Sequence, residues 1–380
     1  MHSLIRRFLH SPCNYGDLGQ KESVIKLKKG FKRETRCYLK RIKSKTGFDE
    51  YKKSEKMGAT RDKVMLFFVE KIAWFLAILF YVIFAVLRPT GMLRWDTLVF
   101  IIYSAVPLGF IVLAESICLI SGNFDISVGM MTGFIGMVAG MIMVWWLPDT
   151  IPAPLTILLP LILGLGCGAL NGSLVGFLGL NPFLATLGTS MVFFGGNLLI
   201  HPYPIYGTDL PKIYTMIGNN EVISLFVFVA TLIVLWFVLR STRFGAHLYA
   251  VGAGPKTASM LGINKGRMYF FVYLIAGFFC GMSALFYTGF LFAISPYTAT
   301  EALFPAFAAA VIGGISLKGG RGSVVNIFAG LILLAVVEAG LSMFAVSPFV
   351  REIVFGCLVI AAIIINRLRD SVRDRILRPV

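Results

Sequence analysis

Acidic and amide side chains gather in one stretch of an otherwise apolar chain. The run over residues 113–133 reads LAESICLISGNFDISVGMMTG, with Glu115 inside an apolar segment and Asp125 between two such segments. An ionisable group at membrane depth costs roughly 2.5–3.5 kcal/mol on insertion scales, and it persists where it faces protein, water or solute. We therefore expect Glu115, Asn123, Asp125 and Ser127 to line a solute pathway.

A plainer role is open for the same residues. Ser127 stands where it could cap the helix that follows, and Asp125 would then lie in the first turn of that helix, near the positive end of its dipole. Glu115 could equally pair with a buried polar neighbour. Two more polar residues, Asn171 and Thr186, lie in later apolar segments and belong to the same candidate pathway.

Glycine recurs at helical spacing in one apolar segment. Consecutive GxxxG steps are formed by Gly164, Gly168, Gly172 and Gly176. Residues four apart share a helix face, and small residues on such a face let two membrane helices approach closely. We predict that this seam packs against another helix. Asn171, in the same segment, could donate a cross-helix hydrogen bond.

Sequence patterns for catalysis and metal binding are absent. A Walker A motif, GxxxxGK[ST], fails before Lys256-Thr257 because Pro255 and Ala250 replace its two glycines. The four histidines show no metal-ligand spacing, and no two of the six cysteines form a CxxC pair. We expect no enzymatic activity, no metal site and no cofactor bound by this chain.

Composition places these residues in a membrane. Hydrophobic residues make up 57% of the 380 and charged residues only 14%, against a soluble norm of about 25%. A bilayer-spanning helix needs about 20 apolar residues. Ten candidate spans run roughly over 67–87, 97–120, 127–147, 155–178, 183–200, 221–239, 269–293, 303–316, 323–344 and 349–366.

These spans predict an all-α polytopic membrane protein with its transmembrane domain over 66–366. The eighth span is short, which indicates a broken or re-entrant segment. An echo between residues 126–129 and 315–317 would fit an internal repeat of the kind that many transporters have.

Charge predicts the orientation of the bundle. With a cytoplasmic N-terminus and alternating spans, 31 of the 35 Lys and Arg residues fall on inward segments. This positive-inside bias places both termini in the cytoplasm and explains the net charge of +16 without nucleic-acid binding. Basic tails at 1–65 and 367–380 flank the bundle. The first tail is expected to be disordered, unless translation starts at Met57 or Met65.

One inward loop, 240–268, is long enough to hold a docking helix for a cytoplasmic partner. A short helix there would begin at Pro255, because proline suits a first turn, and end at Gly262, because glycine suits a C-terminal stop. The residues expected to couple the chain to an ATPase are Pro255, Ala258, Leu261, Gly262 and Ile263.

The chain resembles the ribose/galactose-type permeases of bacterial ABC importers, which are related to the autoinducer-2 permeases. Five ordered elements within about 97–366 carry the resemblance: Gly122–Gly129, Asn171-Gly172, Asn181–Thr189, Thr242–Gly245 with Ala258 and Gly262–Asn264, and Val311–Ser323. Asn123-Phe124 departs from the glycine-isoleucine pair that is usual in the family, a difference that bears on solute preference.

The resemblance implies the permease subunit of an ABC importer for a small polar solute, a ribose-like monosaccharide, in the bacterial inner membrane. It also implies a second permease copy or homologue, a cytoplasmic ATP-binding subunit that holds ATP and Mg²⁺, and a periplasmic or lipid-anchored solute-binding protein. The alternative is a self-sufficient secondary transporter in which Glu115 and Asp125 carry the coupling ions.

Overall fold

The described part of the chain is almost entirely helical. The computed structural model describes residues 67–377, and side chains as far as residue 373, so the predicted tail 1–65 lies outside it. The helices are α4 (Ile72–Leu87), α5 (Pro89–Met92), α6 (Trp95–Ser104), α7 (Val106–Ile120), α8 (Val128–Met141), α9 (Leu158–Gly172), α10 (Pro182–Ile200), α11 (Lys212–Asn219), α12 (Glu221–Ser241), α13 (Arg243–Ala253), α14 (Pro255–Met260), α15 (Lys265–Leu291), α16 (Leu303–Ile312), α17 (Val324–Met343) and α18 (Pro348–Leu377).

Short irregular elements extend or join these helices. A π-helical turn continues α8 (η1, Ile142–Trp146) and another continues α9 (η3, Ser173–Phe177), while a 3₁₀ turn (η2, Ala153–Ile157) leads into α9. Strands β1 (Ile205–Tyr206) and β2 (Ala293–Ile294) pair antiparallel, with Ile205 opposite Ile294.

Each of the ten predicted spans contains a helix, but their lengths differ. Within residues 67–377, seven helices are long and apolar enough to cross a membrane, or eight if the bent pair α6–α7 forms one span. Helices α4 and α16 are apolar but shorter, with 16 and 10 residues. An all-α polytopic membrane fold is therefore confirmed, while the count of ten spans stays a prediction.

The second predicted span is bent. Helices α6 and α7 meet at Ala105 with a change of direction of 42°. Pro107, in the first turn of α7, has no N–H to continue the hydrogen-bond ladder from α6. The bend turns the two halves toward different neighbours, so that α7 enters the core while α6 stays at its edge.

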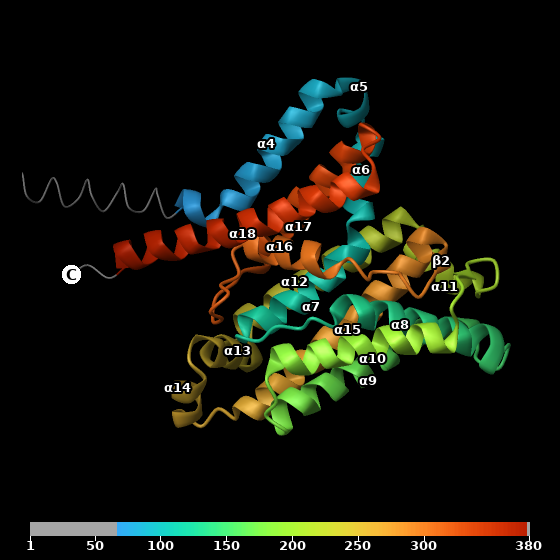
Figure 1. Cartoon of the computed structure of the whole chain (residues 1–380), viewed down its shortest axis with the longest axis horizontal. Helices are drawn as coiled ribbons and strands as arrows, with labels where there is room; N and C mark the ends of the chain where they lie inside the picture. The colour runs from blue at the N-terminus through green and yellow to red at the C-terminus, as the bar shows by residue number, and fades with distance from the viewer. Residues whose placement is uncertain (1–66, 378–380) are drawn as a thin grey trace, which may run out of the picture. The chain divides into compact units, whose positions relative to one another are not determined.

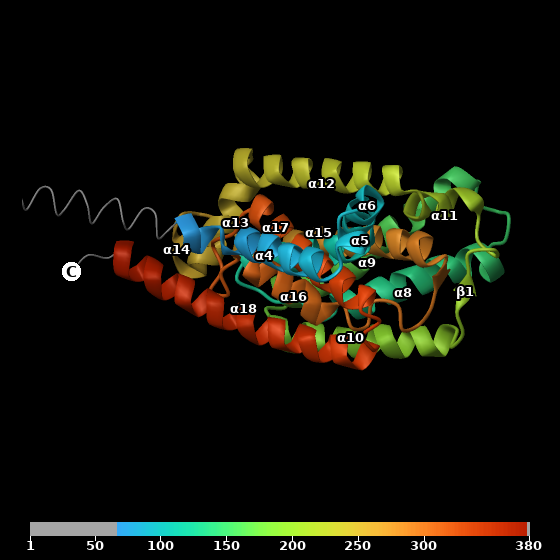
Figure 2. The same cartoon turned by 90° about the horizontal axis from the view of Figure 1, so that it is seen from above.

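Helix α15 forms the centre of the bundle, packed by α7, α8, α9 and α11 (Figures 1 and 2). The glycine seam of α9 faces it: a Cβ added at Gly164, Gly168, Gly172 or Gly176 would overlap the backbone of α15. Asn171 of α9 donates the cross-helix hydrogen bond that the sequence suggested, from its Nδ2 to the hydroxyl of Ser127 at the start of α8, at 2.8 Å.

The last helix extends past the predicted boundary at residue 366. Helix α18 continues to Leu377 where the sequence was expected to leave the bundle as a basic tail. Part of the reason is Arg369, whose guanidinium is buried and donates to the carbonyls of Val311 and Ile312 at 3.3 and 3.0 Å. Its Nε also donates to the carbonyl of Val69 at 3.2 Å, so α18 ties together two distant segments.

Candidate functional site

Five of the six predicted pathway residues form one buried hydrogen-bonded cluster. Asp125 Oδ1 accepts the N–H and the hydroxyl of Ser127 at 2.9 and 2.6 Å, and the Ser127 hydroxyl accepts from Asn171 Nδ2 at 2.8 Å. Thr186 accepts the N–H of Ile126 at 3.0 Å. The cluster therefore fixes the loop before α8 against α9 and α10.

Glu115 completes the cluster from α7. Its Oε2 accepts the N–H of Asp125 at 3.4 Å, while its Oε1 has no hydrogen-bond partner among the described residues. Both carboxyl groups are fully buried, and no ion pair to either is present in residues 67–373. No group of His, Cys, Asp and Glu in that part of the chain could hold a metal ion.

Two local expectations for this loop were wrong. Ser127 is at the N-cap position of α8, but its side chain makes no capping hydrogen bond. Its oxygen accepts from Asn171 Nδ2 instead, while its hydroxyl donates to Asp125. The backbone of Ser127 is also helical, with φ −82° and ψ −12°, rather than extended as a capping serine requires. Asp125 precedes α8 rather than lying in its first turn.

Asn123 lies in the same loop but outside the cluster. Its backbone N–H donates to the carbonyl of Cys118 at 3.0 Å, and its Nδ2 has no partner among the described residues. Since all six predicted side chains are buried, their arrangement here positions a loop. Contact between any of them and a solute stays a prediction.

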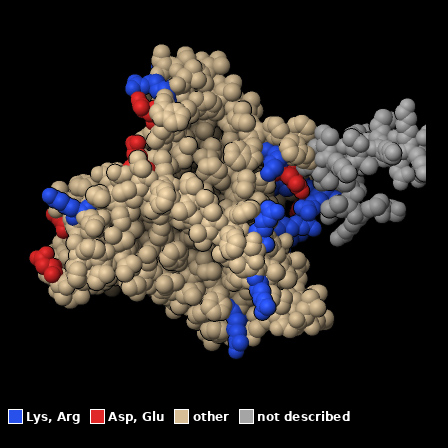
Figure 3. Space-filling model, turned by 180° about the vertical axis from the view of Figure 1, so that it is seen from behind, with Lys and Arg blue, Asp and Glu red and all other residues tan. Residues whose placement is uncertain are grey.

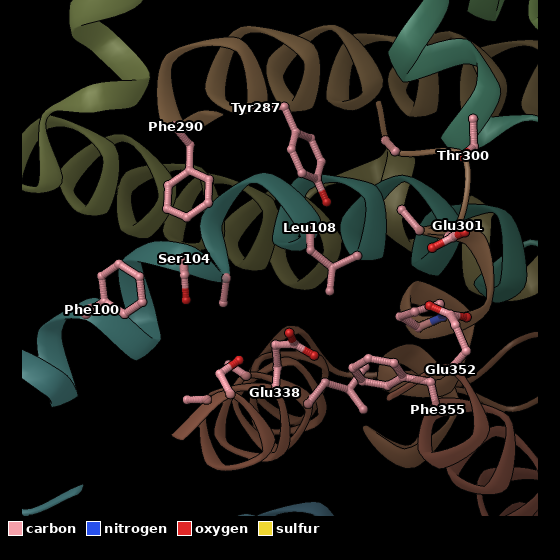
Figure 4. A pocket seen from close by; sticks show the side chains of 18 of the residues that line it. Phe100, Ser104, Leu108, Tyr287, Phe290, Thr300, Glu301, Glu338, Glu352 and Phe355 are labelled. Carbon is pink, nitrogen blue, oxygen red and sulfur yellow. The ribbon is translucent and has the colours of Figure 1, made fainter. Parts of the chain in front are cut away.

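A large cavity, not anticipated from the sequence, lies elsewhere in the bundle (Figure 4). Its volume is about 1010 Å³, and residues of α6, α7, α15, α17 and α18 and of the segment before α16 line it. Aromatic rings form part of the wall: Phe100, Tyr287, Phe290, Tyr297 and Phe355. A space of this size matches the upper end of small-molecule pockets.

Three carboxylates also face this cavity. Glu301 precedes α16, Glu338 lies on α17 and Glu352 lies on α18, and Figure 4 shows their side chains around the same space. Glu338 and Glu352 lie inside predicted apolar spans, so the rule that ionisable residues there mark a pathway could have found them. No pattern in the sequence indicates that these separate segments meet.

The predicted docking helix is present as α14, at one end of the bundle (Figure 1). Thr242 caps the preceding helix α13 by accepting the N–H of Gly245 at 3.3 Å, and Pro255 begins α14. Gly262 ends it with a φ of +82°, in the left-handed region that favours glycine. The backbone of this loop is therefore fixed by its own sequence.

One coupling residue is placed differently from the prediction. Ala258 is only 1% exposed, so its side chain packs inside the loop and cannot form the contact surface. Met260 and Leu261 are 86% and 74% exposed and project from the end of α14. The apolar tip of the loop, Met260 and Leu261, replaces Ala258 as the candidate surface, with Pro255 and Ile263 at its flanks.

The docking loop meets the membrane bundle at a junction of glycines. A Cβ on Gly252 of α13 would overlap the carbonyl of Ile120 and lie 2.5 Å from the nitrogen of Gly320. A Cβ on Gly319 would lie 2.7 Å from both Gly122 Cα and the Gly252 carbonyl oxygen. The loop that starts the buried cluster, the docking loop and the 316–322 loop thus approach closely enough at these glycines for their backbones to touch.

A tyrosine beside this junction adds a second tie. The hydroxyl of Tyr249 on α13 donates to the carbonyl of Gly322 at 2.9 Å. Burial raises the pKa of Tyr249 above its ordinary value of about 10, so the phenol stays a donor at neutral pH. Helix α13 is therefore held to the 316–322 loop by both packing and a hydrogen bond.

Charged side chains divide between the ends of the bundle. Figure 3 shows Lys and Arg gathered toward one end of the visible face, and most of the visible Asp and Glu toward the other. The basic end includes α14 and the C-terminal part of α18. This distribution fits the orientation expected from the sequence, with α14 facing the cytoplasm.

Comparison with known proteins identifies relatives of the chain. Residues 97–363 match the family model described as branched-chain amino acid transport system / permease component. The chain is 29% identical over 312 residues to the autoinducer 2 import system permease protein LsrD of Enterobacter sp. (strain 638), covering 79% of this chain and 94% of the relative. No solved structure matches the chain.

Two sugar permeases are similarly related. The D-allose transport system permease protein AlsC of Escherichia coli (strain K12) is 28% identical over 327 residues, covering 85% of this chain and 99% of the relative. The fructose import permease protein FrcC of Rhizobium meliloti is 29% identical over 282 residues, covering 71% and 78%. The resemblance seen in the sequence motifs is confirmed.

Proposed function

Because this chain belongs to the family of permease components of branched-chain amino acid transport systems, we propose that it is the membrane-spanning subunit of an ABC importer for a monosaccharide. The relatives named for autoinducer 2, allose and fructose support a small sugar-like solute. The chain itself is not an enzyme, and the ATPase activity lies on a separate subunit.

The observation that carries the proposal is the apolar tip of the docking loop. Single exposed apolar residues are ordinary, but Met260 and Leu261 are adjacent and both nearly free of contacts. They end a short helix whose start and stop are fixed by Pro255 and Gly262. A preorganised apolar pair of this kind suits a groove on a cytoplasmic ATP-binding subunit.

Movement of the apolar tip can be transmitted to the membrane-spanning helices through the docking loop. The docking loop contacts the start of the buried cluster and the 316–322 loop at the glycine junction, where Gly252 touches Ile120 and Gly320. No side chain separates these backbones, so displacement of α13 must displace at least one neighbouring loop. ATP binding on the partner would thereby move the segments before α8 and after α16.

The assembly follows from the same family membership. We propose two permease copies, identical or homologous, two ATP-binding subunits with their ATP and Mg²⁺, and a periplasmic or lipid-anchored solute-binding protein. Both termini would lie in the cytoplasm of a bacterial inner membrane. The solute would enter from the side opposite α14.

The test replaces Leu261, whose side chain is largely exposed. Leu261→Glu should abolish ATP-driven uptake and reduce co-purification of the ATPase, with the permease at its normal membrane level, because a charge cannot enter an apolar groove. Leu261→Met is the matched control and should retain both properties. Gly262→Arg is a poorer test, because its positive φ would strain the loop whether or not a partner docks.

Two results would overturn the proposal. One is normal uptake with a bound ATPase in the Leu261→Glu variant, which would show that the apolar tip does not couple the chain to the ATPase. The other is solute uptake by this chain alone in proteoliposomes, driven by a Na⁺ or H⁺ gradient. That outcome would identify a secondary transporter, with Glu115 and Asp125 as the candidate ion-binding residues.

A further inference from the structure

The large cavity lies toward the end of the bundle opposite α14. Many of its lining residues come from α6, the end of α15, the end of α17 and the start of α18, and the cavity reaches inward to Ser104 and Leu108 at the bend between α6 and α7. In the expected orientation, all four of these helix ends are extracytoplasmic. The cavity therefore occupies the half of the bundle that a solute reaches first on import.

The cavity carries a one-sided charge. Glu301, Glu338 and Glu352 line it, and none of the described residues that line it is Lys, Arg or His. The charge of Glu338 is neutralised by a residue that does not line the cavity, because Arg351 Nη1 binds Glu338 Oε1 at 2.8 Å. Arg351 is itself held by the carbonyl of Val346, which accepts from Nε at 3.1 Å. Glu301 and Glu352 have no basic partner of this kind in residues 67–373. Their carboxyl groups lie within hydrogen-bond reach of each other, so a proton shared between them would leave the pair with one negative charge.

The carboxylates favour a water-filled cavity. A carboxylate that faces lipid is costly, and Glu301 and Glu352 are exposed, so the cavity suits solvent or a polar solute. The remaining wall offers hydroxyl groups, among them Thr97, Ser104 and Tyr287, and flat aromatic surfaces. Ionised carboxylates only accept hydrogen bonds, so they suit a ligand whose polar groups are hydroxyl or ammonium donors.

We propose that this cavity is an outward solute vestibule whose carboxylate pair, Glu301 and Glu352, selects against anions. It would admit uncharged or cationic polyhydroxylated solutes and reject carboxylated or phosphorylated ones. The proposal rests on the proposed import function and adds to it the residues that set the charge of the accepted solute. A cleft lined by one sign of charge changes the local concentration of charged molecules by a factor of about 10–10³.

The experiment measures the electrostatic potential directly. In a chain whose six cysteines are replaced by serine, Ser104→Cys places a thiol in the cavity. Membranes oriented with this face outward are treated with a cationic methanethiosulfonate reagent, the trimethylammonium-ethyl form, and separately with the anionic sulfonatoethyl form. Tyr203→Cys, 69% exposed on the predicted outward loop, corrects for the intrinsic reactivity of each reagent.

The cationic-to-anionic rate ratio at Ser104→Cys should exceed the ratio at Tyr203→Cys by about tenfold or more. Adding Glu301→Gln and Glu352→Gln should lower it to the control value, and so should high salt. Equal ratios at the two positions would overturn the proposal. So would failure of both reagents at Ser104→Cys while Tyr203→Cys reacts.

This readout is independent of the proposed function. Thiol modification requires neither the ATPase nor a known solute, so a negative potential can be found in a chain that fails in ATP-driven uptake. Conversely, a neutral cavity would leave the Leu261→Glu result unaffected. The two failures can therefore be told apart.

Discussion

The backbone N–H of Gly320 donates to the carbonyl of Ile120 across 2.8 Å, and the two residues belong to segments far apart in the sequence. Gly252 lies against both, close enough that a single methyl group would not fit. The contact joins the end of α7 to the loop after α16 at the point where the docking loop reaches the bundle.

Gly252→Ala should therefore damage the protein at this junction. The added Cβ would overlap the Ile120 carbonyl, and relief of an overpacked contact typically costs about 1–3 kcal/mol. We expect a lower melting temperature in detergent and reduced uptake. Gly254→Ala is the matched control, because its Cβ would meet only Thr257, with Oγ1 at 3.5 Å. Comparable melting temperatures for the two variants would contradict a tight junction.

A second pair of glycines tests the seam between α9 and α15. Gly168→Ala would place a Cβ 3.0 Å from Gly277 Cα and closer still to the Tyr273 carbonyl, so we expect destabilisation of about 1–3 kcal/mol. Gly166→Ala, on the same helix with nothing within 4 Å, should be neutral or slightly stabilising. Thermal unfolding of both purified variants tests this prediction. Equal losses of stability in Gly168→Ala and Gly166→Ala would contradict a close contact between α9 and α15 at these glycines.

The buried cluster can be tested by exchanging its partners. Asp125→Asn puts an amide where Asp125 Oδ2 now accepts from Asn171 Nδ2 at 3.5 Å, and Asn171→Asp sets a third carboxylate beside Glu115 and Asp125. Each single variant should lower stability. The double exchange restores one carboxylate and one amide, and it should recover part of the loss, with a coupling energy of about 0.5–3 kcal/mol.

The measurement is the melting temperature of the wild type, both single variants and the double variant. Strict additivity of the two losses would mean that the residues do not act as a pair. Uptake measured on the same four proteins then shows whether a stable cluster is also sufficient for transport.

Orientation is tested by single thiols in the cysteine-free chain. A membrane-impermeant maleimide applied to intact spheroplasts should label Tyr203→Cys and leave Ser259→Cys unlabelled until the membrane is opened. Both positions are exposed in the structure, so access and not burial determines the result. Labelling of Ser259→Cys in intact cells would reverse the assigned topology.

Local patterns in the sequence predicted the elements that local rules control. Pro255 and Gly262 bracketed α14 because proline is preorganised for a first turn and glycine for a left-handed stop. The repeated glycines of residues 164–176 indicated a packed helix face, although the identity of α15 as the partner could not be read from one segment.

Features made by distant segments were not predictable in this way. The cavity brings together Glu301, Glu338 and Glu352 from three elements, and no spacing rule relates them. The burial of Ala258 depends on how α14 packs within the docking loop. Helical periodicity alone does not say which face of so short a helix is buried. Ser127 failed as a cap because its oxygen accepts from Asn171, a residue of another helix that the local sequence does not place.

Arg369 has a consequence for the order in which the protein can be assembled. The carbonyls of Val311 and Ile312, at the end of α16, and of Val69, before α4, receive their donor from a residue close to the C-terminus. Until α18 is in place these carbonyls lack the Arg369 donor, although the Val311 carbonyl also accepts from the N–H of Gly314 at 2.9 Å. The contact between α4, α16 and α18 therefore forms only after α18 is in place, and a chain truncated before Arg369 would lack the hydrogen bonds that tie these three segments together.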